Sequence, residues 1–169
     1  VIITAALGTA YTGETGSTST SNSNQIVHGS AGLTIAKLRT AKQTLDLGNV
    51  DPSIPRHIIV SPKQITDLLG TTEVTSSDFN TVKALANGEV NSFLGFNFIV
   101  SNRLALSSTT RSCIAFAQDG IALAVGKDVQ ARIDERSDKS YATQVYYCMS
   151  IGATRMEEAK VVEVQCTES

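Results

Sequence analysis

Hydrophobic and polar positions alternate most regularly in the last third of the chain. In residues 128–134 apolar side chains at the odd positions alternate with charged or amide ones, which predicts a strand with one solvated face. In residues 141–151 the odd positions form the more apolar face of a second long strand. A charged turn at 134–139 separates the two strands, and a closing strand is expected over 160–166. This region is therefore predicted to be a sheet face built to pack and pair.

Apolar residues at helical spacing predict helices in the first half of the chain. Residues 1–7 are expected to end a helix, and 34–47 to form another, with Thr34 as N-cap and Lys37 pointing away from the buried face. The run Ser61–Gln64 carries the signature of a capping box with proline at the first helical position. A further helix is expected to begin near Ser77 or Asp78 and to end at Asn87-Gly88.

Short apolar runs between the helices predict buried strands. One strand is expected at 57–60, and another follows a turn at Gly95. Residues 113–117 and 121–125 flank Asp119-Gly120, a dipeptide that favours a hairpin between them. Helices and strands therefore follow one another without a repeating strand–helix–strand unit, which predicts an α+β fold.

Composition narrows the class of protein. The chain has 169 residues, of which 41% are hydrophobic and 18% charged, and this is enough for one domain with a core. A formal net charge of −2 predicts no general attraction to nucleic acid or acidic membranes, and no apolar run reaches transmembrane length. Residues 9–32 are rich in Gly, Ser, Thr and Asn and are expected to form an exposed loop. Because the chain opens inside an apolar segment without Met, we expect it to be part of a longer protein.

Candidate chemistry is sparse. The histidines His28 and His57 lack partners at metal-ligand spacing, and the three cysteines form no C-x-x-C pair. Acidic residues at 134–138 alternate with basic ones, which argues against a calcium loop. We therefore expect no catalytic, metal or cofactor site and no enzyme activity. A small thiol hydrolase that uses Cys113 or His57 is kept as an alternative, although Arg111 is the only nearby charge that could activate the thiol.

Four segments together resemble the major capsid proteins of tailed phages. These segments are Pro55–Gln64, Leu94–Asn102, Ala117–Gly120 and the block from Asp134 onward, and the resemblance extends from Ala6 nearly to the end. It implies the fold named after phage Hong Kong 97, with an axial domain plus the C-terminal part of the peripheral domain. Family members also carry an N-terminal arm and an extended loop before their spine helix, and neither is present in this chain.

The resemblance implies a division of the chain into three parts. Residues 1–54 would hold the end of the spine helix, an exposed loop and a helix of the peripheral domain. Residues 55–127 would form the axial domain. Residues 128–169 would return to the peripheral domain as strands.

The implied function is that of a structural coat protein. Copies would form the pentamers and hexamers of an icosahedral shell around double-stranded DNA, which they enclose without sequence-specific binding. Decoration or scaffold proteins are further candidate partners, no membrane is involved, and assembly would take place in the host cytoplasm to give the virion. The alternative is a shell of the same fold in a gene-transfer particle or an encapsulin-like nanocompartment. The residues expected at contacts between subunits are Asp134, Glu135, Arg136, Asp138, Lys139 and Glu73.

Overall fold

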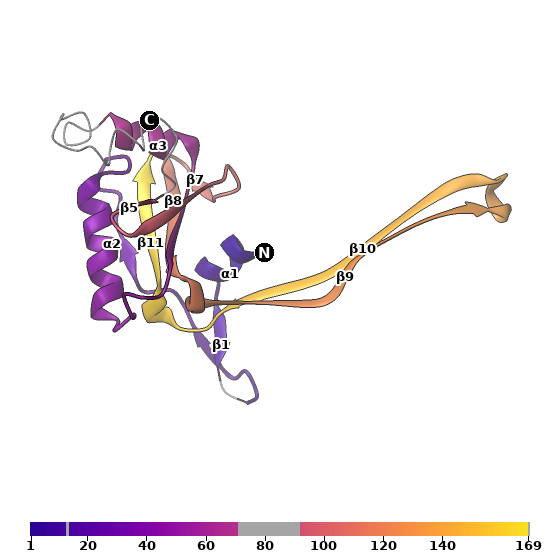
Figure 1. Cartoon of the computed structure of the whole chain (residues 1–169), viewed down its shortest axis with the longest axis horizontal. Coiled ribbons are helices and arrows are strands. Elements are labelled where there is room, and N and C mark those ends of the chain that lie inside the picture. Colours follow the sequence, from indigo (N-terminus) through magenta and orange to yellow (C-terminus); the bar gives the residue numbers. More distant parts are fainter. Residues whose placement is uncertain (13, 71–91, 169) are drawn as a thin grey trace.

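A computed structural model describes residues 1–12, 14–70 and 92–168 of the protein. These residues form a sheet domain and a long two-stranded arm that projects from it (Figure 1). The helices are α1 (Ile2–Leu7), α2 (Ile35–Leu47) and α3 (Pro62–Leu69). The strands are β1 (Ala10–Thr12), β2 (Thr18–Thr20), β3 (Gln25–Ile26), β4 (Arg56–Val60), β5 (Ser92–Phe93), β6 (Phe96–Val100), β7 (Leu106–Ser107), β8 (Thr110–Ala117), β9 (Ile121–Arg136), β10 (Ala142–Arg155) and β11 (Val161–Thr167).

The central sheet is mixed. Its strand order is β3-β11-β8-β4-β6-β5, with β7 also paired to β8. The pairs β11/β8 and β4/β8 are antiparallel, whereas β4/β6 and β3/β11 are parallel. Helix α2 packs against β8 and β11, and the core lies between the helix and the sheet. The largest fully buried apolar side chains are Leu33, Leu38, Leu45, Ile58, Val60, Leu68, Phe96, Ile114, Val161 and Val162.

The predicted helix boundaries are confirmed where the structure describes them. The side chain of Thr34 accepts a hydrogen bond from the backbone N–H of Lys37 at 3.4 Å, so it caps α2 as expected. The capping box of α3 is also present, because Gln64 Oε1 accepts from the Ser61 backbone N–H at 3.1 Å. The helix predicted from Ser77 or Asp78 lies outside the described residues.

Lys37 departs from its predicted orientation. It is buried, and its ammonium group donates to the carbonyl oxygens of Ala31 (2.7 Å), Gly32 (2.8 Å) and Gln165 (3.0 Å). Three charge-assisted hydrogen bonds compensate the ammonium for lost water. The side chain thus joins α2, the segment before it and β11.

The hairpin predicted between 113–117 and 121–125 is wrong. Strand β8 pairs with β4 and β11, and β9 pairs with β10 instead. Residues Gln118–Gly120 form a 3₁₀ turn through which the chain leaves the sheet. Lys160 Nζ binds Asp119 Oδ2 at 2.6 Å across this corner. The Asp-Gly pair does mark a change of chain direction. No hairpin forms there because β4 and β11 pair with the two edges of β8, which leaves no edge for β9.

The exposed loop predicted over 9–32 also contains regular structure. Strands β1 and β2 pair as an antiparallel hairpin, and β3 adds to the edge of the central sheet beside β11. Much of the segment is exposed, as expected. Its short strands contain few apolar residues, so the alternation that predicts strands is missing from them.

The carboxylate of Glu168, near the C-terminal end of the chain, is hydrogen-bonded to side chains of the sheet domain. The guanidinium of Arg111 binds both carboxylate oxygens of Glu168 at 2.9 Å, and Gln64 Nε2 and Ser61 Oγ donate to Oε1 at 2.9 and 3.1 Å. These donors, chiefly Arg111, lower the pKa of Glu168 to about 2. The side chain is 17% exposed.

We expect this carboxylate to make folding stability depend on pH. Its pKa is lower in the folded protein than the ordinary 4.5, so its contribution is present above about pH 5 and is lost as pH falls toward 2. With a discount for partial exposure, wild-type protein should lose about 1 to 2 kcal/mol from this group between pH 7 and pH 3. Urea unfolding of Glu168→Gln should show a correspondingly smaller loss between these pH values. Glu135→Gln, at an exposed position, is the control and should behave like wild type.

Candidate assembly surface

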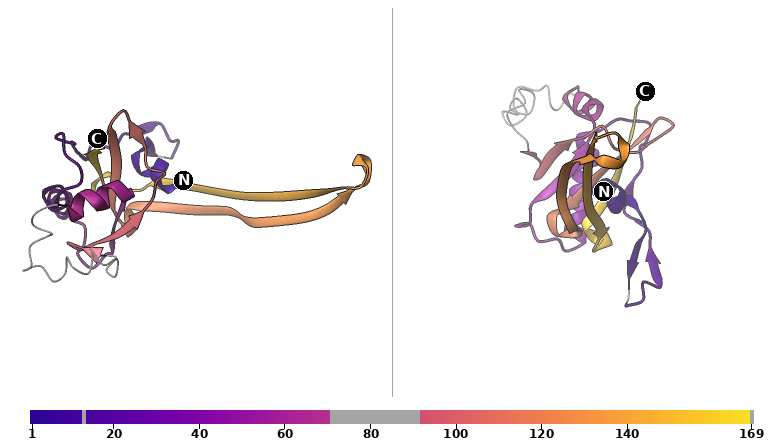
Figure 2. Two further views of the ribbon diagram at one scale, coloured as in Figure 1. Left: turned by 90° about the horizontal axis from the view of Figure 1, so that it is seen from above. Right: turned by 90° about the vertical axis from the view of Figure 1, so that its right-hand side faces the viewer.

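The most prominent surface of the molecule is the arm formed by β9 and β10. The two strands contain 16 and 14 residues and pair antiparallel from Ile121/Arg155 at the root to Arg136/Ala142 at the tip. At a rise of about 3.3 Å per residue, the arm is about 50 Å long. It extends away from the sheet domain in Figure 1 and in the left view of Figure 2.

The pairing register gives the arm two chemically different faces. Directly paired residues share a face of a two-stranded ribbon, and side chains alternate between the faces along each strand. One face is apolar, and we call it the apolar arm face. The opposite face carries mostly polar and charged side chains, and we call it the polar arm face. The apolar arm face comprises Leu123, Val125, Ala131, Ile133, Val145, Tyr147, Met149, Ile151 and Ala153.

Two irregularities in β9 preserve this separation. The register shifts between Cys148 and Ser150 and again between Ser150 and Ile151, so β9 contains extra residues opposite this part of β10. Consequently Lys127 pairs with Ser150 and shares the polar arm face. Without the shift next to it, continued alternation from Val125 would place this lysine among the apolar residues. Re-aiming a side chain in this way is a common role of β-bulges.

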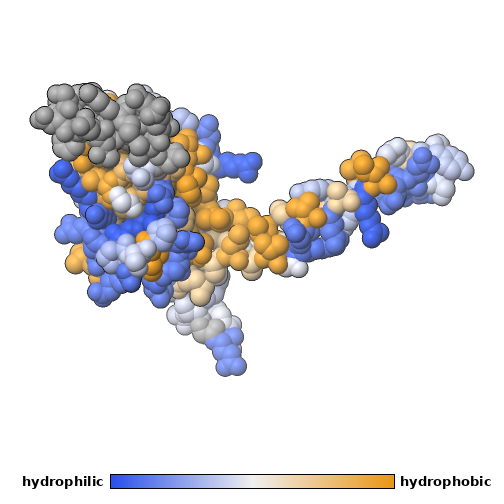
Figure 3. Space-filling view, viewed as in Figure 1, coloured by the Kyte–Doolittle hydropathy of each residue, from blue (hydrophilic) through white to orange (hydrophobic). Residues whose placement is uncertain are grey.

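Neither face of the arm is covered in the single chain. The large side chains of the apolar arm face are between 47 and 72% exposed, except that of Ile151 at the root, which is partly buried. The prediction of a strand with one solvated face is therefore wrong for β9, because both faces are solvated. Figure 3 shows apolar residues gathered over the root of the arm and in patches farther out. Exposed apolar surface of this extent marks an interaction site, and an isolated two-stranded ribbon is only marginally stable.

The charged tip of the arm brings together five of the six residues predicted at subunit contacts. Asp134, Glu135 and Arg136 end β9, and Asp138 and Lys139 lie in the 3₁₀ turn that leads toward β10. Arg136 binds Asp138 through Nε–Oδ1 (2.9 Å) and Nη2–Oδ2 (2.5 Å), and this hydrogen bonding lowers the pKa of Asp138. Asp134, Glu135 and Lys139 have no ion pair among the described residues.

Glu73, the sixth residue predicted at a subunit contact, lies outside the described residues. The role of the other five in subunit contacts stays a prediction.

A buried arginine that the sequence analysis had not assigned fixes the root of the arm. Arg155 Nη1 donates to the carbonyl oxygens of Ala6 (2.8 Å) and Gly8 (3.0 Å), and Nη2 donates to that of Thr20 (2.8 Å). The last residue of β10 therefore holds α1 and the β1–β2 hairpin. The only sequence signal for this role was an arginine at the end of an alternating strand. It could not identify the partners of Arg155, because they lie far away in the sequence.

An apolar groove continues the apolar arm face onto the sheet domain. It has a volume of about 360 Å³ and lies between α1, strands β4, β6 and β8, and the arm root. Leu123 and Ile151 belong to both the groove and the apolar arm face. The two surfaces therefore form one continuous apolar strip.

Comparison with known proteins identifies the family. The family model described as phage capsid protein matches residues 1–168. This chain belongs to the phage capsid protein family. Its α+β capsid fold, predicted from the sequence, is confirmed by the solved structures that it matches. Among curated proteins, none matches the chain.

Three solved structures illustrate the similarity. A structure of Mycobacterium phage Che8 matches with 17% identity and a TM-score of 0.67, over 85% of this chain and 53% of that one. The capsid of cyanophage P-SCSP1u matches with 17% identity and a TM-score of 0.65, over 99% and 60%. The capsid of an empty GTA particle matches with 14% identity and a TM-score of 0.62, over 85% and 49%. The chain thus spans about half to three fifths of these capsid proteins, and at these identities the likeness concerns the fold.

The thiol that was kept as an alternative nucleophile is poorly suited to catalysis. Cys113 is buried, and a hydrogen bond with Cys166, together with burial, raises the pKa of its thiol. An activated cysteine requires the opposite shift. His57 packs against the ring of Phe116, with ring centroids 5.6 Å apart. Within residues 1–12, 14–70 and 92–168, no three His, Cys, Asp or Glu side chains are grouped to hold a metal, and no helix could cross a membrane.

Proposed function

We propose that the chain is the shell-forming part of a major capsid protein that self-assembles into an icosahedral head around double-stranded DNA. The observation that supports this most directly is the exposed apolar arm face in a member of the phage capsid family. Such a face is stable in water only when another surface covers it. Repeated contacts of one kind that close around symmetry axes give a closed shell. Several modest contacts per subunit then act together.

The division into domains remains a proposal as well. In it, residues 1–54 and 128–169 belong to a peripheral domain and 55–127 to an axial domain around the capsomer axes. Strand β11 lies in the same sheet as β4 and β8, so the two domains share a continuous sheet. The remaining proposals are the virion as location, assembly in the host cytoplasm and accessory decoration or scaffold proteins.

Electron microscopy of the purified native protein, with an intact-mass measurement of its subunit, tests the proposal. Closed particles built from this protein are the expected result. Protein that stays small and monodisperse under all assembly conditions would contradict it. Packaged DNA would support a phage head or a gene-transfer particle, whereas a packaged enzyme would support the nanocompartment alternative.

Charge reversal at the arm tip should weaken assembly. In the double variant Arg136→Glu/Lys139→Glu, two cations of the tip become anions beside Asp134 and Glu135. If the tip contacts a neighbour, assembly should fall at low ionic strength and the defect should diminish near 1 M salt, because salt screens exposed charges. Light scattering across a salt series measures this. Lys127→Glu on the polar arm face is the control, and unchanged assembly of the double variant would show that the tip is only solvated.

A further inference from the structure

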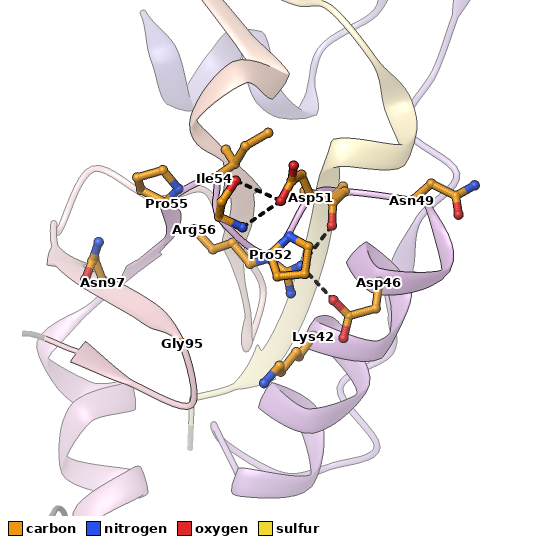
Figure 4. A pocket seen from close by; sticks show the side chains of 12 residues that line it. Lys42, Asp46, Asn49, Asp51, Pro52, Ile54, Pro55, Arg56, Gly95 and Asn97 are labelled. Carbon is orange, nitrogen blue, oxygen red and sulfur yellow. Dashed lines mark hydrogen bonds and ion pairs between the residues drawn. The ribbon is translucent and has the colours of Figure 1, made fainter.

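A polar pocket of about 680 Å³ lies beside the C-terminal end of α2 (Figure 4). Its walls are the last turns of α2, residues 49–55 that lead into β4, and the turn between β5 and β6. The volume is within the usual range for ligand pockets. The polar side chains and turn residue that matter here are Lys42, Asp46, Asp51, Arg56, Gly95 and Asn97.

The buried arginine of this pocket has unused hydrogen-bonding capacity. Arg56 is only 6% exposed, and its Nη2 donates to Asp46 Oδ1 (2.6 Å) and to the carbonyl of Val50 (3.2 Å). Its Nε is buried and has no partner among the described residues. A guanidinium has five N–H donors in a planar fork suited to carboxylates. Leaving a buried donor unpaired is unfavourable, so the site favours a further acceptor.

Each of the two carboxylates of the pocket has one oxygen, Oδ1, that already accepts hydrogen bonds from the chain itself. Asp46 forms an ion pair with Arg56. Asp51 Oδ1 accepts hydrogen bonds from the backbone N–H (2.8 Å) and the hydroxyl (2.7 Å) of Ser53, and these bonds lower the pKa of Asp51. The carbonyl groups of the last turn of α2 accept from the N–H groups of residues 48–50. The negative end of the helix is therefore partly satisfied by the chain itself.

The groups left over are mainly donors. Lys42 is exposed and forms no ion pair among the described residues, and its ammonium points across the gap toward the β5–β6 turn that contains Gly95 (Figure 4). The side-chain amide of Asn97 lines the opposite wall. Gly95 has φ +84° and open space where a side chain would stand, so no side chain projects from this position into the pocket. A lysine, an arginine and an amide around one opening suit a carboxylate.

We propose that this pocket receives an acidic side chain of a second copy of the chain, Asp134 or Glu135 at its arm tip. This inference rests on the proposed assembly and gives the tip a partner. The two tip carboxylates have no ion pair among the described residues, and Lys42, a cation of the pocket that also has none there, can pair with one of them. The arm leaves the sheet domain on the side opposite α2, so a chain cannot fill its own pocket (Figure 1). Head-to-tail contacts of this kind are heterologous and can close into rings.

Zero-length cross-linking of assembled protein tests the contact directly. Equal amounts of ¹⁴N- and ¹⁵N-labelled protein are assembled together, treated with a carbodiimide that joins amines to carboxylates, and digested for mass spectrometry. The expected product is Lys42 joined to Asp134 or Glu135 across the two isotope labels. Lys42→Arg keeps the charge but lacks the reactive amine, so it should assemble and lose this product.

Charge exchange provides the second readout. Lys42→Glu should weaken association roughly tenfold, and combining it with Glu135→Lys should restore most of the loss. Lys63→Glu, an exposed reversal on α3, is the matched control and should leave association unchanged. Particles that form without a cross-label product at Lys42 would overturn the pocket contact and leave the proposed function standing. Absence of both particles and product would overturn both.

Discussion

Tyr147→Asp is expected to abolish particle formation while leaving the sheet domain folded. The side chain is 62% exposed in the single chain and lies in the middle of the apolar arm face, opposite Ala131. In the free subunit the aspartate would remain in water, so urea unfolding should change by no more than about 0.5 kcal/mol. In an assembled particle the same carboxylate would be buried in an apolar contact, at a cost of several kcal/mol per copy.

The chain offers a closely matched control one residue away. Tyr146 is also a half-exposed tyrosine in β10, but it pairs with Arg132 and lies on the polar arm face. Tyr146→Asp should therefore assemble nearly as well as wild type in electron microscopy and sedimentation. Equal loss of assembly in both variants would disprove the assignment of the two faces. Normal assembly of Tyr147→Asp would remove the arm from the assembly surface.

Arg155→Met should cause the largest loss of folding stability among the substitutions considered. The variant keeps a long apolar side chain but leaves the carbonyl groups of Ala6, Gly8 and Thr20 without their common donor. Loss of hydrogen bonds to a buried charged group and the resulting unpaired acceptors should reduce the free energy of unfolding by about 3 kcal/mol. The physical reason is that one buried guanidinium joins the last residue of β10 to both α1 and the β1–β2 hairpin.

Urea unfolding measures the total effect, and hydrogen exchange locates it. Faster amide exchange should appear in α1 and the β1–β2 hairpin, with little change in β8 and β11. Arg132→Met, an exposed position on the polar arm face, is the control and should stay within about 0.5 kcal/mol of wild type. A loss of stability no larger than that of the control would show that the three carbonyl groups are satisfied without Arg155.

Local signals predicted the helices well. The caps at Thr34 and at Ser61–Gln64 depend on residues within one turn of each other, so the sequence contains all their partners. The alternation in 141–151 likewise predicted which side chains of β10 share a face. Pairing over long distances was not predictable in this way. The turn signal at Asp119-Gly120 is local, whereas the partners of β8 come from distant parts of the chain.

Charged side chains were the other source of error. Lys37 and Arg155 are of residue types that are usually exposed to solvent, yet both are buried. Their charged groups donate hydrogen bonds to backbone carbonyl groups of other segments. Their partners are main-chain atoms, which have no side-chain signature in the sequence. The charged turn at the arm tip was predicted from the sequence, because all its charged residues are close together in the chain. The pocket near α2 was not predicted, since α2, residues 49–55 and the β5–β6 turn meet only in the folded chain.

The position of the arm between β8 and β11 has a consequence for the order of folding. Phe116 at the end of β8 pairs with Val161 at the start of β11, so the entire arm is the connection of one very long hairpin. The turn at Ser137–Lys139 closes with little loss of chain entropy, and pairing can then proceed from there to Ile121 and Arg155. The ribbon thereby carries the last strand back to the sheet. β8 and β11 are distant in sequence, but once the ribbon has formed their ends are held close together. Their pairing then closes only a short loop, which favours fast folding.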